Sequence, residues 1–363
     1  MFKYLIEVRP LGFLYGSAGA FLSPENLVGR SGAKFPPDAA TLSGLILRTY
    51  QEIPSADPEK IKHLKQNLTV AGAFWAKDNK PQNFYVPIPR SLVIGEKDAD
   101  EWEITDDKWG KNLDKNVDAD YKWQSIHFWG NPLDEIFKNR EKKENYQNKN
   151  TIQSTAEPPW KFVPMLHPTL EHEQRHVRTP LDKNDRGSLF LENTVQMRED
   201  SCLVYLSTHE IPNGWYRFGG ENHMVEIINH ELEPNILRLF TEPIKKSFAL
   251  ICPAVWGGNN LSVRYPQAFK AGEKPPKMLT DRPVPFRYRM GGNLGIGRYA
   301  VPSGTVYVLK HELAEEYNTW WKFPHKWFPQ SNEEKDFDKR PLPLKHLGSG
   351  LCLPITIKGV DDV

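Results

Sequence analysis

The most obvious candidate for catalysis is the segment 172–176, which reads His-Glu-Gln-Arg-His and matches the HExxH pattern of zinc peptidases. That chemistry needs both histidines on one face of a helix, with the glutamate as general base. Pro168 and Pro180 bracket the segment and leave little room for such a helix. We therefore expect no metal and no other cofactor, and we interpret the segment as an exposed basic loop. Its candidate phosphate contacts are Arg175, His176 and Arg178.

A second candidate is the glycine-rich segment 291–297, which reads Gly-Gly-Asn-Leu-Gly-Ile-Gly. It departs from GxGxxG and precedes a strand pattern instead of opening a helix, so it does not predict a dinucleotide site. The surrounding stretch 282–311 carries five lysine and arginine side chains and no aspartate or glutamate. Glycines let backbone N–H groups approach a phosphate, and the alternative is a structural turn between strands. The predicted RNA contacts are Arg287, Arg289, Gly291, Gly292, Asn293 and Arg298.

Two further glycine loops carry cations. Residues 29–34 read Gly-Arg-Ser-Gly-Ala-Lys and lie just before a predicted helix, whose N-terminus attracts phosphate. Residues 348–350 read Gly-Ser-Gly and follow Lys345 and His346. The candidates from these two loops are Arg30, Lys34, Gly348 and Gly350.

The composition excludes several classes of protein. Three cysteines, Cys202, Cys252 and Cys352, form no CxxC pair, so we expect neither a zinc ribbon nor a disulfide framework. No apolar run approaches the roughly 18 residues of a membrane helix, so we expect a cytoplasmic protein with no membrane contact. The net charge of +1 over 363 residues means that any contact with nucleic acid must come from local basic patches.

The elements that must position these residues follow an α+β pattern of short strands and few helices. Residues 4–8 predict a strand, and a helix follows Asp38 with Leu42, Leu45 and Ile46 on one face. The other predicted strands are 68–76 and 84–88, joined by a polar turn; the hairpins 188–197 with 202–208 and 215–218 with 224–228; and the strands 247–255 and 305–309.

Between residues 96 and 160 the composition shifts to charged and amide side chains with irregular apolar spacing. Tryptophans interrupt this stretch, among them Trp109 and Trp123. We interpret it as an insertion that partly folds or docks onto a partner, with these tryptophans as anchors for the partner surface.

Several segments, taken in order, resemble RAMP proteins of type III CRISPR effector complexes. Residues 35–44 resemble the helix entry of that family, which runs from a proline pair to a glycine. Residues 68–74 and 86–89 resemble one branch, the type III-B (Cmr) subunit that holds the 5′ tag of the guide RNA beside the large polymerase-like subunit. The segments 176–178, 187–192, 217–221 and 299–307 fit the same branch. The resemblance spans most of the chain.

The resemblance implies two ferredoxin-like (RRM-like) domains, 1–95 with part of 160–230 and then 230–363, with the charged, tryptophan-containing insertion at 96–160. It implies a non-catalytic subunit that binds the crRNA 5′ tag in antiviral defence. Its implied partners are the large polymerase-like subunit, a neighbouring RAMP backbone subunit and, indirectly, the target RNA. The contact candidates carried over are Arg30, Lys34, Ser43, Arg48, Arg217, Gly219, Gly220, Gly348 and Gly350.

The chain departs from the family pattern after its first strand. Relatives often carry Arg-Asp-Gly-Arg there, whereas residues 15–19 read Tyr-Gly-Ser-Ala-Gly. Two other functions remain open. One is a RAMP endoribonuclease that processes precursor guide RNA, with His172 or His176 as general acid/base. The other is a scaffold that makes no direct contact with RNA.

Overall fold

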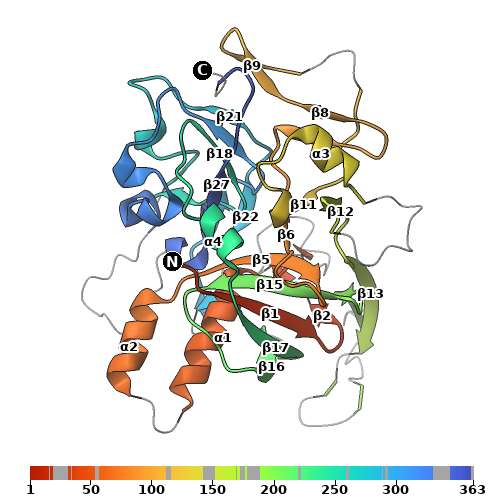
Figure 1. Ribbon diagram of the computed structural model, residues 1–363. Coiled ribbons are helices and arrows are strands. Elements are labelled where there is room, and N and C mark those ends of the chain that lie inside the picture. Colours follow the sequence, from red (N-terminus) through yellow and green to blue (C-terminus); the bar gives the residue numbers. More distant parts are fainter. Residues whose placement is uncertain are drawn as a thin grey trace, which may run out of the picture.

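The structure is a computed structural model, shown in Figure 1. It describes residues 1–15, 17–18, 32–33, 35–53, 57–111, 116–141, 152–168, 170–171, 176–177, 189–219, 222–258, 261–287, 289–290, 293–329 and 344–360. The described chain is rich in strands and has few helices, as the α+β pattern predicts. No helix in these ranges is both long and apolar enough to cross a membrane.

The larger of the two principal sheets has eight strands in the order β12-β11-β6-β5-β15-β1-β17-β16. All its strand pairs are antiparallel. Its strands are β1 (Tyr4–Pro10), β5 (Val70–Lys77), β6 (Tyr85–Pro87), β11 (Trp123–Ser125), β12 (Thr155–Ala156), β15 (Ser201–Ser207), β16 (Gly214–Phe218) and β17 (His223–Glu231).

The centre of this sheet has the strand order of a ferredoxin-like domain. Numbered along the chain, β1, β5, β15 and β17 lie in the order 2-3-1-4. The crossover from β1 to β5 carries α1 (Ala39–Gln51) and α2 (Pro58–Asn67). The second crossover, from β15 to β17, contains the edge strand β16 and no helix among its described residues.

The smaller sheet repeats this strand order. Its strands lie in the order β21-β26-β18-β27, which is again 2-3-1-4, and all pairs are antiparallel. The strands are β18 (Ser247–Leu250), β21 (Lys277–Leu279), β26 (Val306–Val308) and β27 (Cys352–Pro354). Its crossovers contain short 3-10 helices: η3 (Gln267–Phe269), η4 (Glu315–Tyr317), η5 (Trp320–Lys322), η6 (His325–Trp327) and η7 (Leu344–Leu347).

The strand β1 is buried on both faces from Leu5 to Val8, where Leu5, Ile6 and Val8 are apolar and Glu7 is a buried carboxylate. Ile6 and Val8 pack on one face with Leu42 and Ile46 of α1, as the helical spacing predicts. Leu5, on the other face, belongs to a core shared with the smaller sheet. In Figure 1 the helices α1 and α2 therefore lie below the large sheet, and the smaller sheet lies above it.

Asp38 occupies the N-cap position of α1, as expected, but its side chain makes no capping hydrogen bond to the helix. On α2, by contrast, the N-cap Asp57 accepts a hydrogen bond from the backbone N–H of Glu59 at 2.9 Å. The capping hydrogen bond therefore stabilises α2 locally, whereas the stability of α1 comes from the burial of its apolar face.

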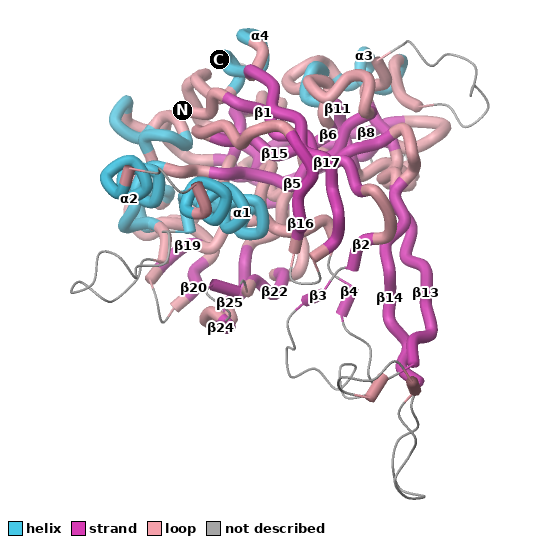
Figure 2. The backbone as a smooth tube through the Cα atoms, turned by 90° about the horizontal axis from the view of Figure 1, so that it is seen from below, coloured by secondary structure: helices cyan, strands magenta, loops and turns pink. Residues whose placement is uncertain are grey.

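The hairpin predicted at 188–208 is wrong. β14 (Leu189–Met197) pairs with β13 (Trp160–Pro168) and β2 (Leu14–Tyr15), whereas β15 joins the large sheet. Two consecutive strands with a polar turn look alike in sequence whether or not they pair, so the turn alone misled the prediction. The predicted hairpin at 215–228 is confirmed as β16 and β17. Figure 2 shows β13 and β14 as a long ribbon that projects from the body.

The segment predicted as an insertion is partly built into the large sheet, because β11 pairs with β6 and β12 pairs with β11. Trp123 lies edge-on to Trp75 and Trp160, with ring centroids 6.4 and 5.8 Å apart. Trp109 packs against the shared core. These tryptophans thus pack against their own chain while remaining partly exposed, and their role as anchors for a partner stays a prediction.

The remaining elements are short. Within the insertion lie β7 (Leu92–Ile94), β8 (Ala99–Glu101), β9 (Glu103–Thr105), β10 (Lys108–Gly110), η2 (Ile126–Phe128) and α3 (Leu133–Lys138). Elsewhere lie β3 (Ser17–Ala18), β4 (Gly32–Ala33), α4 (Pro234–Leu239), β19 (Trp256–Gly257), β20 (Ser262–Val263), β22 (Val284–Phe286), β23 (Arg289–Met290), β24 (Asn293–Leu294) and β25 (Arg298–Ala300).

Candidate nucleic-acid and partner interface

The basic stretch predicted to bind RNA forms two short hairpins on the second half of the chain. β22 pairs with β25, and β23 pairs with β24. Phe286 and Ala300 are buried and fix the base of the first hairpin, whereas Ile296 and Tyr299 are 64% and 58% exposed. The stretch is thus held at its base, and it exposes Ile296 and Tyr299 to solvent.

Two of its arginines bind carbonyl groups of their own chain. Arg287 Nε donates to the carbonyl of Gly295 at 2.6 Å, and Arg298 Nη1 donates to the carbonyl of Gly258 at 3.0 Å. A guanidinium has five N–H groups, so each of these bonds uses only part of its capacity. Of the other predicted contacts, Arg289 and Asn293 lie in β23 and β24, and Gly291 and Gly292 lie outside the described residues.

The β13–β14 ribbon and these basic hairpins lie on the same side of the molecule, at the bottom of Figure 2. His176 lies in the described pair 176–177, where Val177 bridges to Leu170 and the carbonyl of His176 accepts from the N–H of Glu171 at 3.0 Å. Its side chain is exposed. Arg175 and Arg178 lie outside the described residues, as do His172 and Glu173 of the HExxH match. Among the residues that the structure describes, no group of three or more His, Cys, Asp or Glu could hold a metal ion.

A second exposed surface lies on the large sheet. Tyr216, Val225 and Ile227 face the core under α1, so their neighbours along the strands face the other way. On that outer face Trp215 is 72% exposed and Met224 is 44% exposed. We call the surface formed by Leu11, Trp215, Arg217 and Met224 the open sheet face.

The cross-strand register decides which charges on this side are paired. Trp215 lies opposite Glu226, and Glu226 lies opposite Arg9, whose Nη1 is 3.8 Å from the Glu226 carboxylate. In the next row Arg217 lies opposite Met224, whose carbonyl accepts from the N–H of Leu11 at 3.1 Å. Arg217 is exposed, and within the described residues its side chain contacts no carboxylate.

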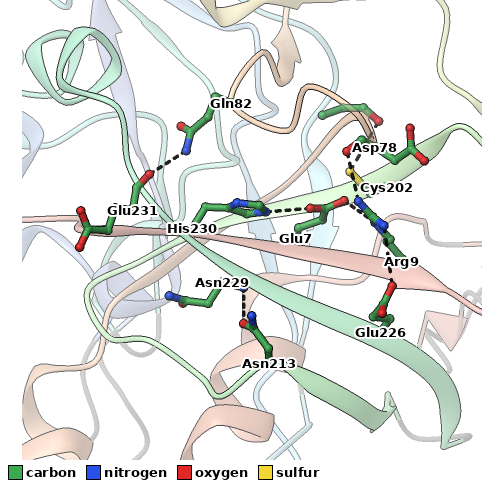
Figure 3. Close-up of polar contacts among 11 residues, drawn as sticks. Glu7, Arg9, Asp78, Gln82, Cys202, Asn213, Glu226, Asn229, His230 and Glu231 are labelled. Atoms are coloured by element: carbon green, nitrogen blue, oxygen red, sulfur yellow. Dashed lines mark hydrogen bonds and ion pairs between the residues drawn. The ribbon is translucent and has the colours of Figure 1, made fainter.

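A buried carboxylate keeps Arg9 in place, as Figure 3 shows. Glu7 is 1% exposed and accepts from Arg9 Nε at 2.6 Å, and its other oxygen lies 2.8 Å from His230 Nε2. Arg9 also donates to the carbonyl of Asp78 at 3.2 Å. Both oxygens of this carboxylate are therefore engaged, so the cluster joins β1 to β5 and β17 and offers no free base.

The neighbouring Cys202 is not an activated nucleophile. Its side chain is fully buried and its thiol donates to the carbonyl of Ala76 at 3.7 Å. Burial, followed by the nearby carboxylate of Glu7, raises the pKa of the thiol well above its usual value. A reactive cysteine needs the opposite shift, towards the thiolate.

The remaining predicted contacts are scattered. Ser43 is 2% exposed and its hydroxyl is buried, so it presents no surface to RNA in this conformation. Arg48 is exposed and pairs with Glu52 at 2.7 Å. Gly219 is exposed at the end of β16 and has a φ of +76°, which favours glycine. Arg30, Lys34 and Gly220 lie outside the described residues.

The glycines of the 348–350 loop are buried and have packing roles. Both have positive φ angles, +73° for Gly348 and +69° for Gly350. A Cβ at Gly348 would lie 2.7 Å from Ala71, and one at Gly350 would lie 2.6 Å from the Trp256 ring. Close packing, against the first half at Gly348 and within the second half at Gly350, therefore explains why glycine occurs here, while contact with RNA stays a prediction without exposed surface to support it.

The cation beside this loop is structural, and its role was missed in the sequence. Lys345 Nζ donates to the carbonyls of Trp321 and Phe323 at 2.9 and 2.5 Å, and it lies 5.4 Å from the centroid of the Trp320 ring. Burial lowers its pKa to about 8. Carbonyl partners carry no signature in sequence, so no pattern could have revealed this contact.

Comparisons with known proteins give structural similarities at low sequence identity. No family model matches the chain, and no curated protein matches it. A chain of the type III-B Cmr-beta complex bound to cognate target RNA is similar, with a TM-score of 0.45, 11% identity and coverage of 84% of this chain and 86% of that chain.

Two structures of type III-A and related assemblies are also similar. A chain of the Csm3–Csm4 subcomplex of the type III-A CRISPR–Cas interference complex gives a TM-score of 0.40, 9% identity and coverage of 87% and 96%. A chain of the Csm1–Csm4 cassette in complex with cA4 gives 0.39, 12% identity and coverage of 98% of both chains. Because these TM-scores are below 0.5, the function of this chain must be argued from its own residues.

Proposed function

We propose that this chain is a non-catalytic, guide-RNA-binding assembly subunit of a type III CRISPR effector complex, and that it contacts the 5′ tag of the crRNA. The segments that resemble RAMP proteins span most of the chain, and the strand order of a ferredoxin-like sheet occurs twice. The observation that carries the proposal is one side of the molecule, which combines the acid-free basic hairpins with the projecting β13–β14 ribbon (Figure 2).

The chemistry of that side suits a phosphate backbone. Guanidinium groups and exposed backbone donors bind phosphates without reading sequence, and such contacts position an RNA strand. Tyr299, exposed beside Arg298 on β25, adds a ring on which an unpaired base can stack. The proposed partners are the crRNA, the large polymerase-like subunit and a neighbouring RAMP backbone subunit, with target RNA reached through the guide.

The endoribonuclease alternative needs a general acid and base close to the scissile phosphate. Within the described residues, the exposed His176 side chain contacts no carboxylate that would orient it, and Glu7 and Cys202 are buried in structural contacts. These observations favour binding over cleavage. Incubation of the purified chain with repeat RNA, with and without divalent ions, should leave the RNA intact. Site-specific cleavage that disappears in His176→Ala would establish the enzyme instead.

The binding proposal is tested by the salt dependence of RNA affinity. Removal of one cation that neutralises a phosphate of single-stranded RNA should lower the slope of log K against log salt by about 0.7. Arg289→Ala with Arg298→Ala should therefore weaken binding of the assembled complex and lower that slope by about 1.4, equally for all tag sequences. Arg238→Ala, an exposed cation on α4, is the matched control.

Gly292→Val separates RNA binding from folding. If the glycine backbone approaches a phosphate, this variant should weaken binding with an almost unchanged salt slope and a normal melting temperature. If the glycine is needed only for a turn, the variant should lower the melting temperature, and the double arginine variant should bind RNA normally. An unchanged affinity of the double variant in the assembled complex rules out the assignment.

A further inference from the structure

We infer that the strand β16 is a docking edge at which an extended segment of a protein partner adds one more strand to the large sheet. The segment presents an apolar side chain to Trp215 and a carboxylate to Arg217. The inference rests on the proposed function only for the expectation that this partner is a subunit of the same complex.

The first observation is the unpaired edge. β16 ends the order of the large sheet and pairs with β17 alone, so no other described strand covers its outer side. Edge strands in soluble proteins are usually shortened, covered or interrupted, because their free N–H and C=O groups template pairing with another chain. Here Gly214–Phe218 has five regular residues and no proline. The backbone groups needed for strand addition are therefore available among the described residues.

The second observation is the composition of the open sheet face beside that edge. Trp215 is 72% exposed, Leu11 53% and Met224 44%, and they surround Arg217. Tryptophan, methionine and arginine are enriched at the buried centres of protein interfaces. A tryptophan left open on a regular strand withdraws its large apolar area from water only when something covers it.

The third observation is charge, which distinguishes a protein from RNA. Arg9, the other cation nearby, is neutralised by Glu7 and Glu226, so it is not available to a phosphate. Among the described residues, Arg217 is the cation that remains between these apolar side chains, an arrangement suited to one carboxylate on a neighbouring strand. Leu11 and Met224 offer nothing to a phosphate backbone. The surface thus favours a protein segment with alternating apolar and acidic side chains.

The register defines what the incoming strand must carry. Trp215 and Arg217 are two residues apart on the same face, and Tyr216 between them faces α1. A strand added beside β16 therefore places side chains of the same parity against this pair, apolar at one position and acidic two residues away. The intervening side chain approaches the α1 side, where space is limited by the packed helix.

Exchange of backbone amides tests the pairing directly. In the assembled complex, the amides of segment 215–218 that point away from β17, those of Trp215 and Arg217, should exchange with deuterium at least about tenfold more slowly than in the free chain, because hydrogen bonds to the added strand protect them. The amides of β21, an edge strand of the smaller sheet, give an internal comparison. Unchanged exchange at Trp215 and Arg217 in a complex that binds guide and target RNA would overturn the inference and leave the proposed function intact.

Crosslinking identifies the occupant. Trp215 is replaced by a photo-crosslinking phenylalanine analogue in the full chain, which is then assembled into the complex and irradiated. The expected product is an adduct with another protein subunit, in a segment that has an acidic residue two positions from an apolar one. An adduct with RNA, or with a second copy of this chain, overturns the inference.

Substitutions at Trp215 and Arg217 measure how much the docking edge contributes to binding of the partner subunit. Trp215→Ala and Arg217→Glu should each weaken binding of the partner subunit by at least about 30-fold, the effect of removing a central interface residue. The matched controls are Leu261→Ala, which removes a 67% exposed side chain, and Arg238→Glu on α4. All four positions are exposed, so melting temperatures should stay within about 2 °C of the parent. Equal reductions in affinity in the controls would contradict a specific docking edge.

Discussion

The two principal sheets of this protein share one strand order, but different elements cover their faces. The larger sheet carries α1 on one face, where Leu42 and Ile46 pack against its side chains. The described helices in the crossovers of the smaller sheet are all short 3-10 helices, and its core is filled by rings such as Trp256, Phe269 and Trp327. The comparison shows that strand order specifies a fold of this kind, while the covering layer can be helical or aromatic.

The two sheets are not independent, because they share a core. Leu5 of the large sheet and Phe248 of the small sheet belong to the same cluster of buried side chains. Phe2 stacks with Trp320 at 5.9 Å and meets Trp321 edge-on at 4.7 Å. We therefore expect the two halves to unfold in one cooperative transition. Substitutions in the helical layer and in the aromatic layer measure how much each contributes to the free energy of unfolding.

The largest effect is expected in the aromatic covering of the small sheet. Phe269 is 2% exposed and lies edge-on to Trp256 and Trp327. Phe269→Ala should lower the free energy of unfolding by about 4 kcal/mol, because it removes a buried ring and leaves a cavity. The matched change on the large sheet is Leu42→Ala, with an expected loss of about 3 kcal/mol. Denaturant titration measures both, and a loss below about 1 kcal/mol for Phe269→Ala would show that the rings are not the core.

The next effect tests Gly350, which packs closely against Trp256 within the second half. Gly350→Ala should cost about 3 kcal/mol, because it combines a φ of +69° with a Cβ 2.6 Å from the Trp256 ring. Gly219→Ala has a similar φ of +76° but meets nothing within 4 Å, so it should cost only about 1 kcal/mol. Equal costs would mean that backbone conformation, and not the close contact, requires glycine at 350.

A pH-dependent effect is expected beside the same loop. Burial, followed by the nearby His325 and Lys345, lowers the pKa of His346 from its usual 6.5 to about 4. The unfolded chain therefore takes up a proton first, and stability is fully present above about pH 6.5 and falls as the pH drops towards 4. The loss should be up to about 3 kcal/mol. His346→Phe should remove this dependence, and an unchanged profile in that variant would place its origin elsewhere.

The smallest effect concerns the helical covering of the large sheet. Asp57 accepts from the N–H of Glu59 at 2.9 Å and caps α2. Asp57→Ala should cost about 1 kcal/mol, whereas Asp57→Asn keeps a capping oxygen and should cost less than about half of that. Thermal unfolding measures both variants. A larger loss of stability in Asp57→Ala than in Gly350→Ala would contradict the expected order of these effects.

Much of the fold could be predicted from local pattern. The period of Leu42 and Ile46 marked α1, and the alternation around Gly219 marked the hairpin of β16 and β17. The resemblance implied two ferredoxin-like domains, and the strand order of both sheets agrees with it, although within the described residues α-helices occur in a crossover of the first sheet and not of the second. Local pattern wrongly predicted a hairpin at 188–208, because the choice of pairing partner for a strand depends on residues distant in sequence.

The candidate site likewise has features that follow from local sequence and features that depend on the tertiary structure. The sequence by itself determined that residues 282–311 form an acid-free basic stretch and that Arg217 lies on a strand, because charge and alternation are local properties. Only the tertiary structure decided which cations are free to bind. It buries Gly348 and Gly350 against Ala71 and Trp256, and it pairs Arg9 with Glu7 while leaving Arg217 beside an open edge. Burial and ion pairing depend on which strands, distant in sequence, become neighbours in space. Only the packing of the whole chain determines those neighbours.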